Sequence, residues 1–179
     1  ASLSTGTARE TKTQGVAGAL RHAAISSQML RLGTTAHGPV AALAFADEDT
    51  LHVARHGIVS TYDVATATLR RSRRLLPCRA HGLAATRDAV CAWGVGAVAV
   101  ERGDAIVERA TDAPRVVAAA WRGNEVVAAW SDGAVDALDA RLATSSRDTR
   151  LCGGGELRCA ALRLDAAGVA CAGGDAFGR

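Results

Sequence analysis

The stretch VVAAAWRGNEVVAAWSDGAVDALD, residues 116–139, contains three short apolar runs separated by turn residues. Each run is four to six residues long, a length typical of β-strands rather than helices: Val116–Trp121, Val126–Trp130 and Val135–Leu138. The pair Asp132-Gly133 is typical of a tight turn, because glycine adopts positive φ angles at no steric cost. This stretch therefore predicts antiparallel strands joined by hairpin turns.

Similar runs fill the chain from Pro39 onward and fall into sets of four. The first set consists of Val40–Phe45, Leu51–Ala54, Ile58–Tyr62 and Thr68–Arg71. The second consists of Leu83–Ala85, Val90–Trp93, Ala97–Val100 and Ile106–Arg109. A weak run at Leu142–Ser145 completes the third set, and a fourth begins with Leu157–Leu164 and Val169–Ala172. The sequence therefore predicts an all-β protein built from four-stranded units.

Two independent markers repeat with the period of these sets. The first is the glycine in the turn between second and third strands, with spacings of 39 and 37 residues, at Gly57, Gly96 and Gly133, and next at Gly173 or Gly174. The second is an acid that follows the last apolar residue of a third strand, every 38 residues, at Tyr62-Asp63, Val100-Glu101 and Leu138-Asp139. A period of about 40 residues is typical of β-propellers, whose four-stranded blades bury their faces against neighbouring blades.

The predicted fold class is therefore an incomplete β-propeller of about three and a half four-stranded blades. The expected blades are residues 37–76, 80–111, 114–150 and, incompletely, 155–179. Because propellers usually have four to eight blades, we expect the sequence to be the N-terminal part of a longer protein. A β-sandwich is the alternative fold.

Residues 1–36 lack this pattern and are expected to form a flexible or partly helical N-terminal tail. The segment Val16–Leu32 has apolar residues at helical spacing, although glycines and serines weaken it. The tail is rich in Ser, Thr and Arg with Glu10 as its only acid, which also resembles a transit peptide. An ordinary tail and a targeting segment both remain open.

The composition sets further limits. Apolar residues make up 49% of the chain but aromatic residues only 3%, so the core must consist of small, closely packed side chains. The five cysteines are irregularly spaced, which indicates free, mostly buried thiols in a reducing compartment, and a cytoplasmic location is expected. No apolar stretch reaches the roughly 18–20 residues that a membrane-spanning helix needs.

The repeat resembles the WD-repeat family, in which a blade ends its third strand with a Trp-Asp pair. Tyr62-Asp63 is the nearest match, whereas Val100 and Leu138 replace the aromatic residue later, and His81-Gly82 stands loosely for the family's Gly-His. The resemblance implies a WD40-type β-propeller. Within the family, three segments look most like a non-catalytic partner of a tRNA ribose 2′-O-methyltransferase: His81-Gly82, Val116–Trp121 with Val126–Ala129, and Leu157–Leu164 with Val169–Gly173. That resemblance implies an adaptor that binds the methyltransferase and helps to position tRNA for methylation of the wobble nucleotide.

The densest charge feature is an arginine cluster, which is the candidate nucleic-acid-binding site: Arg70, Arg71, Arg73 and Arg74. Four guanidinium groups can bind a phosphate backbone. If the strand continues, alternation places Arg71 and Arg73 on one face and Arg70 and Arg74 on the other, which divides the patch. A solvated outer strand whose charge prevents edge pairing is the equal alternative.

Other candidate sites are weak. Cys78 and His81 have the spacing of half a zinc site, but no C-x-x-C motif accompanies them. The five histidines lie in no recognisable nucleophile motif. The three tryptophans lie on expected strands, which favours packing over base stacking. We therefore expect a protein with no enzymatic activity, cofactor or metal, either the tRNA-methyltransferase adaptor or a general protein-interaction scaffold.

Overall fold

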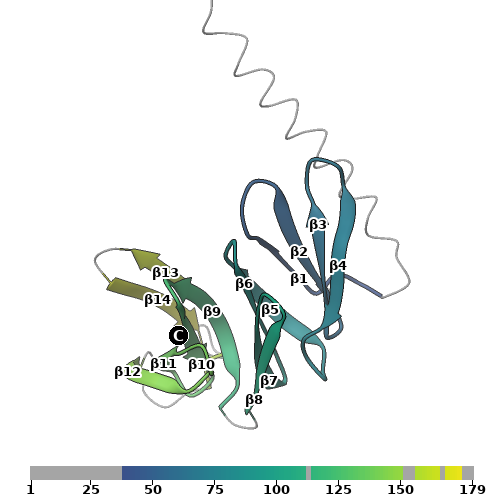
Figure 1. Ribbon diagram of the computed structural model, residues 1–179. Helices are drawn as coiled ribbons and strands as arrows, with labels where there is room; N and C mark the ends of the chain where they lie inside the picture. Colours follow the sequence, from purple (N-terminus) through teal and green to yellow (C-terminus); the bar gives the residue numbers. More distant parts are fainter. Residues whose placement is uncertain (1–37, 112–113, 151–155, 166–167, 175–179) are drawn as a thin grey trace, which may run out of the picture. The chain divides into compact units, whose positions relative to one another are not determined.

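The computed structural model describes residues 38–111, 114–150, 156–165 and 168–174, and these residues form fourteen strands and no helix (Figure 1). The strands of the first two sheets are β1 (Ala42–Phe45), β2 (Thr50–Arg55), β3 (Ile58–Asp63), β4 (Thr68–Arg74), β5 (Ala80–Ala85), β6 (Ala89–Gly94), β7 (Gly96–Arg102) and β8 (Ala105–Thr111). The others are β9 (Val116–Arg122), β10 (Glu125–Trp130), β11 (Ala134–Leu138), β12 (Thr144–Arg150), β13 (Cys159–Asp165) and β14 (Gly168–Gly174). The prediction of an all-β protein is confirmed.

Consecutive strands pair antiparallel into sheets that follow the chain. Three sheets are four-stranded, in the orders β1-β2-β3-β4, β5-β6-β7-β8 and β9-β10-β11-β12, and β13 pairs with β14 in a fourth. The first strands of successive sheets also contact one another, β1 with β5, β5 with β9 and β9 with β13. First strands therefore lie at a common edge, as the innermost strands of propeller blades do.

Apolar clusters join each sheet to the next. Between the first and second sheets the cluster consists largely of alanine, and Ala54, Ala92 and Ala99 are completely buried. The cluster between the second and third sheets adds Trp93 and Trp130. In the third cluster, Ala118, Val127, Ala129 and Val135 pack against side chains of β13. The expected core of small side chains is thus confirmed.

The turns confirm part of the glycine prediction and correct the rest. Gly96 and Gly133 have φ angles of 78° and 81°, as a tight turn requires. At the first such turn the positive φ, 53°, belongs to His56 rather than to Gly57. Gly57 is required for another reason, because a Cβ there would clash with the backbone carbonyl of Leu76. Gly173 and Gly174, expected in the next such turn, instead lie in β14, where they pair with Ala160 and Cys159.

The fourth strands are longer than their apolar runs indicate. The run Thr68–Arg71 extends to Arg74 in β4, and Ile106–Arg109 extends to Ala105–Thr111 in β8. In the third sheet the fourth strand is Thr144–Arg150, and Leu142 lies in the preceding turn with a φ of 59°. Polar residues continue these strands because the backbone pairs with the third strand whatever the outer side chains are.

Two thiols illustrate the range of cysteine environments. Cys91 is completely buried in β6, and burial raises the pKa of its thiol to about 12. Cys159 on β13 is exposed. For this residue, the expectation of a buried thiol is therefore wrong. The N-terminal tail, with its candidate helix Val16–Leu32, and Cys152 lie outside the described residues. Within the described part of the chain, no helix is long and apolar enough to cross a membrane.

Candidate functional site

All four arginines of the cluster lie on β4, the outer strand of the first sheet. The strand continues through Arg74, and an irregularity opposite Thr61 and Tyr62 displaces Arg70 from the regular register. As alternation predicts, Arg71 and Arg73 both face the second sheet. The structure therefore divides the cluster into two parts.

Arg71 and Arg73 bind the hairpin that joins β7 to β8. The Nη2 atom of Arg71 lies 2.6 Å from Oε1 of Glu101, and its two terminal nitrogens donate to the carbonyl oxygen of Gly103 at 3.0 Å. The Nη2 atom of Arg73 lies 2.9 Å from Oδ1 of Asp104 and its Nη1 atom 3.4 Å from Oε1 of Glu101. The Glu101 side chain is only 9% exposed, whereas Arg71 and Arg73 are 35% and 34% exposed, so the ion pairs join the first two sheets around one buried carboxylate.

Arg70 binds within its own sheet. It pairs with Asp63, the acid that follows the third strand's last apolar residue. The hydrogen bond from Arg70, and then that from the backbone N–H of Thr66, lower the pKa of Asp63 to about 2. Arg74 is exposed and forms no ion pair with any described residue. Three of the four guanidinium groups are thus engaged by acids of this chain.

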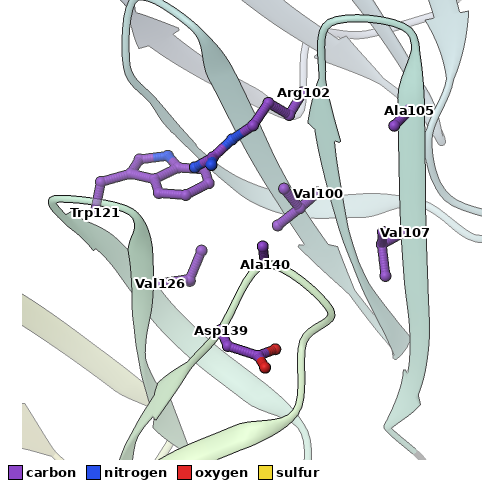
Figure 2. A pocket seen from close by; sticks show the side chains of 8 residues that line it. All are labelled: Val100, Arg102, Ala105, Val107, Trp121, Val126, Asp139 and Ala140. Atoms are coloured by element: carbon purple, nitrogen blue, oxygen red, sulfur yellow. The ribbon is translucent and has the colours of Figure 1, made fainter.

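A pocket occupies the corresponding position between the second and third sheets. Val107 of β8 faces the third sheet as Arg71 of β4 faces the second, so a short apolar side chain stands where the first sheet has an arginine. The result is a cavity of about 180 Å³ (Figure 2). Its lining is mostly apolar and consists of Val100, Arg102, Ala105, Val107, Trp121, Val126, Asp139 and Ala140.

Two charged groups and one aromatic ring give the pocket its polarity. The guanidinium of Arg102 lies over the Trp121 ring, 5.9 Å from the centroid, as Figure 2 shows. The indole Nε1–H of Trp121 donates to the carbonyl oxygen of Ala84 at 3.0 Å, which fixes the ring. Asp139 lies at the opposite side and accepts hydrogen bonds from the backbone N–H groups of Arg141 and Ala143, at 2.8 and 3.0 Å.

The polar groups of the lining are few. It contains no histidine, cysteine, serine or lysine, and its one carboxylate, Asp139, is hydrogen-bonded within its own turn. Cys78 and His81, the candidate half of a zinc site, lie near the start of the second sheet, where Cys78 is half-buried and His81 is exposed. Among the described residues, no three histidine, cysteine or acidic side chains cluster in a way that could hold a metal ion.

Sequence reasoning did not identify this pocket. As expected, Trp121 packs against the core cluster between the second and third sheets, although it is only half-buried and carries Arg102 on its ring. Trp93 and Trp130 do pack in the core, at 7% and 3% exposure. The sequence did contain one signal for the pocket. Val107 of β8 occupies the position that Arg71 occupies in β4, but this becomes visible only after the two strands are aligned.

Comparisons with known proteins show which solved structures have a similar fold. No protein-family model matches the chain, and a search of curated proteins also found no match. The computationally designed protein Ika4 is similar in structure, with a TM-score of 0.62 and 19% identity over 82% of this chain and 91% of that one. The Cps50 (Swd1) β-propeller domain of Myceliophteria thermophila has a TM-score of 0.61 and 15% identity over 76% of this chain and 49% of that one.

A chain of the mitotic checkpoint complex is also similar, with a TM-score of 0.58 and 21% identity over 72% of this chain and 42% of that one. The chain therefore spans less than half the length of the last two structures, although it spans most of Ika4. At these identities the likeness concerns the fold. Together with three four-stranded sheets and the two-stranded fourth, it shows that the chain has the fold of an incomplete β-propeller of about three and a half blades.

Proposed function

We propose that this chain is a non-catalytic scaffold whose blades bind a protein partner. The observation that carries the proposal is the apolar pocket between the second and third blades, which presents Trp121 and Arg102. Tryptophan and arginine are among the side chains most enriched at the energetic centres of protein interfaces. The fold supports the same conclusion, because one structurally similar chain comes from a multi-component assembly, the mitotic checkpoint complex.

Affinity purification tests this proposal. The chain is expressed with a tag in cells that naturally produce it, and the captured material is treated with RNase before elution. We expect a protein partner that resists RNase and re-forms a stoichiometric complex from purified components. Loss of every partner after RNase treatment, or turnover of a substrate by the purified chain alone, would argue against a protein-binding scaffold.

A finer proposal follows from the sequence resemblance, which points to WD repeat-containing protein 6. Under this proposal the partner is a tRNA ribose 2′-O-methyltransferase, the protein acts in the cytoplasm, and Arg70, Arg71, Arg73 and Arg74 contact tRNA. Its support is limited to the resembling blade segments, because three of the four arginines already pair with acids. Co-purification of a methyltransferase, with its loss abolishing tRNA capture, is the expected result. Fluorescence imaging of the tagged protein checks the location.

A further inference from the structure

The pocket between the second and third blades is large enough for one aromatic ring. Its volume is about 180 Å³, and an apolar cavity of about 150 Å³ is known to bind benzene. The side chains of Val100, Val107 and Val126 supply apolar surface, and Figure 2 shows them around the cavity. Ala105 and Ala140 line it from exposed positions, so the pocket is reached from solvent. An aromatic side chain from outside the molecule can therefore enter.

Arg102 is available to a ligand in a way that the neighbouring arginines are not. Arg71 and Arg73 donate to acids and carbonyl groups of the β7–β8 hairpin. Arg109, which also lies over a tryptophan, donates to the carbonyl oxygen of Leu142 at 2.9 Å. Arg102 makes only its contact with the Trp121 ring, with no hydrogen bond or ion pair to the described residues. Its N–H groups therefore remain able to bind a carboxylate, in a geometry that the ring holds in place.

The carboxylate on the other side of the pocket already accepts hydrogen bonds from the chain. One oxygen of Asp139, Oδ1, accepts two backbone N–H groups within its own turn. That arrangement stabilises the turn before β12. The guanidinium of Arg102 has no such hydrogen-bond partners among the described residues, and its positive charge favours a negative ligand group.

From the volume, the apolar lining and the available guanidinium of Arg102, we propose that the pocket receives an aromatic side chain of a partner polypeptide, with an acidic residue beside it binding Arg102. The proposal rests on the scaffold function proposed above and specifies the chemistry that the partner presents. A polypeptide suits the site because the aromatic ring fills the cavity while the chain itself stays outside, over Ala105 and Ala140.

A small molecule with the same two groups provides the probe. The ¹⁵N-labelled chain is titrated with 3-phenylpropionate, which has one phenyl ring and one carboxylate, and NMR monitors the indole N–H of Trp121. We expect a saturable shift of this signal. The cation 3-phenylpropylamine should bind more weakly, because it lacks the carboxylate. A shift that does not saturate, or equal affinity for the amine, overturns the proposal.

Variants separate the two features of the pocket. Arg102→Gln should weaken 3-phenylpropionate roughly three- to tenfold and leave 3-phenylpropylamine unaffected or tighter. The control Arg74→Gln removes the same charge from an exposed position outside the pocket and should change neither affinity. Val107→Phe should abolish binding by filling the cavity. Because that change affects a half-buried position, Ala140→Leu at the exposed rim provides a second way to close the pocket.

The same variants distinguish failure of the pocket from failure of the scaffold function. A partner recovered by affinity purification should bind Ala140→Leu and Arg102→Gln at least roughly tenfold more weakly than the unchanged protein. Equal recovery with both variants overturns the pocket proposal and leaves the scaffold intact. Binding of 3-phenylpropionate without any protein partner contradicts the scaffold function itself.

Discussion

Glu101 is the residue that most directly joins two sheets. Its carboxylate receives Arg71 and Arg73 and is almost completely buried, whereas Asp104, which meets the same two arginines, is 94% exposed. Burial strengthens the attraction within an ion pair. If one partner is removed, the charge that stays buried without its partner destabilises the folded protein. The two acids of one hairpin should therefore differ in their contributions to stability.

We predict that Glu101→Gln lowers the free energy of unfolding by about 1–3 kcal/mol, because two guanidinium groups lose their shared buried carboxylate. Asp104→Asn is the matched control and should cost less than about 1 kcal/mol, since exposed pairs contribute little. Urea denaturation of the three proteins measures both values. An equal decrease in the free energy of unfolding for the two substitutions would contradict the position of Glu101 at a sheet interface.

Asp63 gives a prediction for acid conditions. Its pKa in the folded protein is about 2, below the ordinary value of 3.8 for an aspartate, mainly because Arg70 donates a hydrogen bond to it. The stability that Asp63 contributes is therefore present above pH 4 and is lost as the pH falls toward 2. Asp63→Asn should flatten this part of the stability profile, measured by urea denaturation between pH 5 and pH 2.

The control for this profile is Asp88→Asn, in the exposed turn between β5 and β6, where the described residues provide no ion pair. That substitution should leave the pH profile unchanged. Carboxyl NMR gives the pKa of Asp63 directly. A value near 4 for Asp63 would contradict the pairing with Arg70.

At the scale of elements, the turn between β2 and β3 separates two roles that sequence reasoning assigned to one glycine. His56 adopts the positive φ, and Gly57 allows the backbone at Leu76 and Cys78 to approach closely. Leu75 and Leu76 donate their backbone N–H groups to the carbonyl oxygen of Gly57. The turn is therefore the point at which the connection between the first two blades is attached.

We predict that Gly57→Ala destabilises the protein by about 1–3 kcal/mol, because the added methyl group clashes with a backbone carbonyl that cannot move freely. His56→Gly is the matched control, since it relieves a positive φ without adding an atom, and its effect should stay within about 1 kcal/mol. Thermal denaturation compares them. A Gly57→Ala protein as stable as the parent would mean that the connection does not approach this turn.

The strands that carry apolar residues could be predicted, and the outer strands only in part. The runs in β6, β7, β10 and β11 are buried, and their apolar residues mark them in the sequence. The strands β4 and β8 are largely exposed, so their polar ends have no apolar pattern and extend only because the backbone pairs with β3 and β7. This is why the position of Arg73 and Arg74 on a strand was left open.

The candidate site was harder to predict than the strands because it depends on contacts between sheets. The arginine cluster was visible in the sequence, but its partners Glu101 and Asp104 lie about 30 residues away. The pocket depends on the short side chain of Val107 facing the third sheet and on the stacking of Arg102 on Trp121. No local spacing encodes either relation.

At the scale of the whole molecule, Arg71 and Arg73 of β4 join the first two blades, and we propose that partner binding uses the next junction. One variant tests whether the arginine cluster serves stability or nucleic-acid binding. Arg70, Arg71, Arg73 and Arg74 are replaced together by glutamine, which removes every positive charge of the cluster and keeps a polar side chain at each position. Both stability and nucleic-acid binding are then measured on the same protein.

The most direct test is the comparison of this variant with the parent by urea denaturation and by tRNA titration at several salt concentrations. We predict a clear loss of stability, about 2 kcal/mol or more from the broken pairs with Glu101 and its neighbours. We also predict no change in tRNA affinity or in its salt dependence, in contrast to the tRNA contact that the finer adaptor proposal gives to these arginines. Unchanged stability, together with weaker tRNA binding and a flatter salt dependence, would contradict the account and assign the arginine cluster to nucleic-acid recognition.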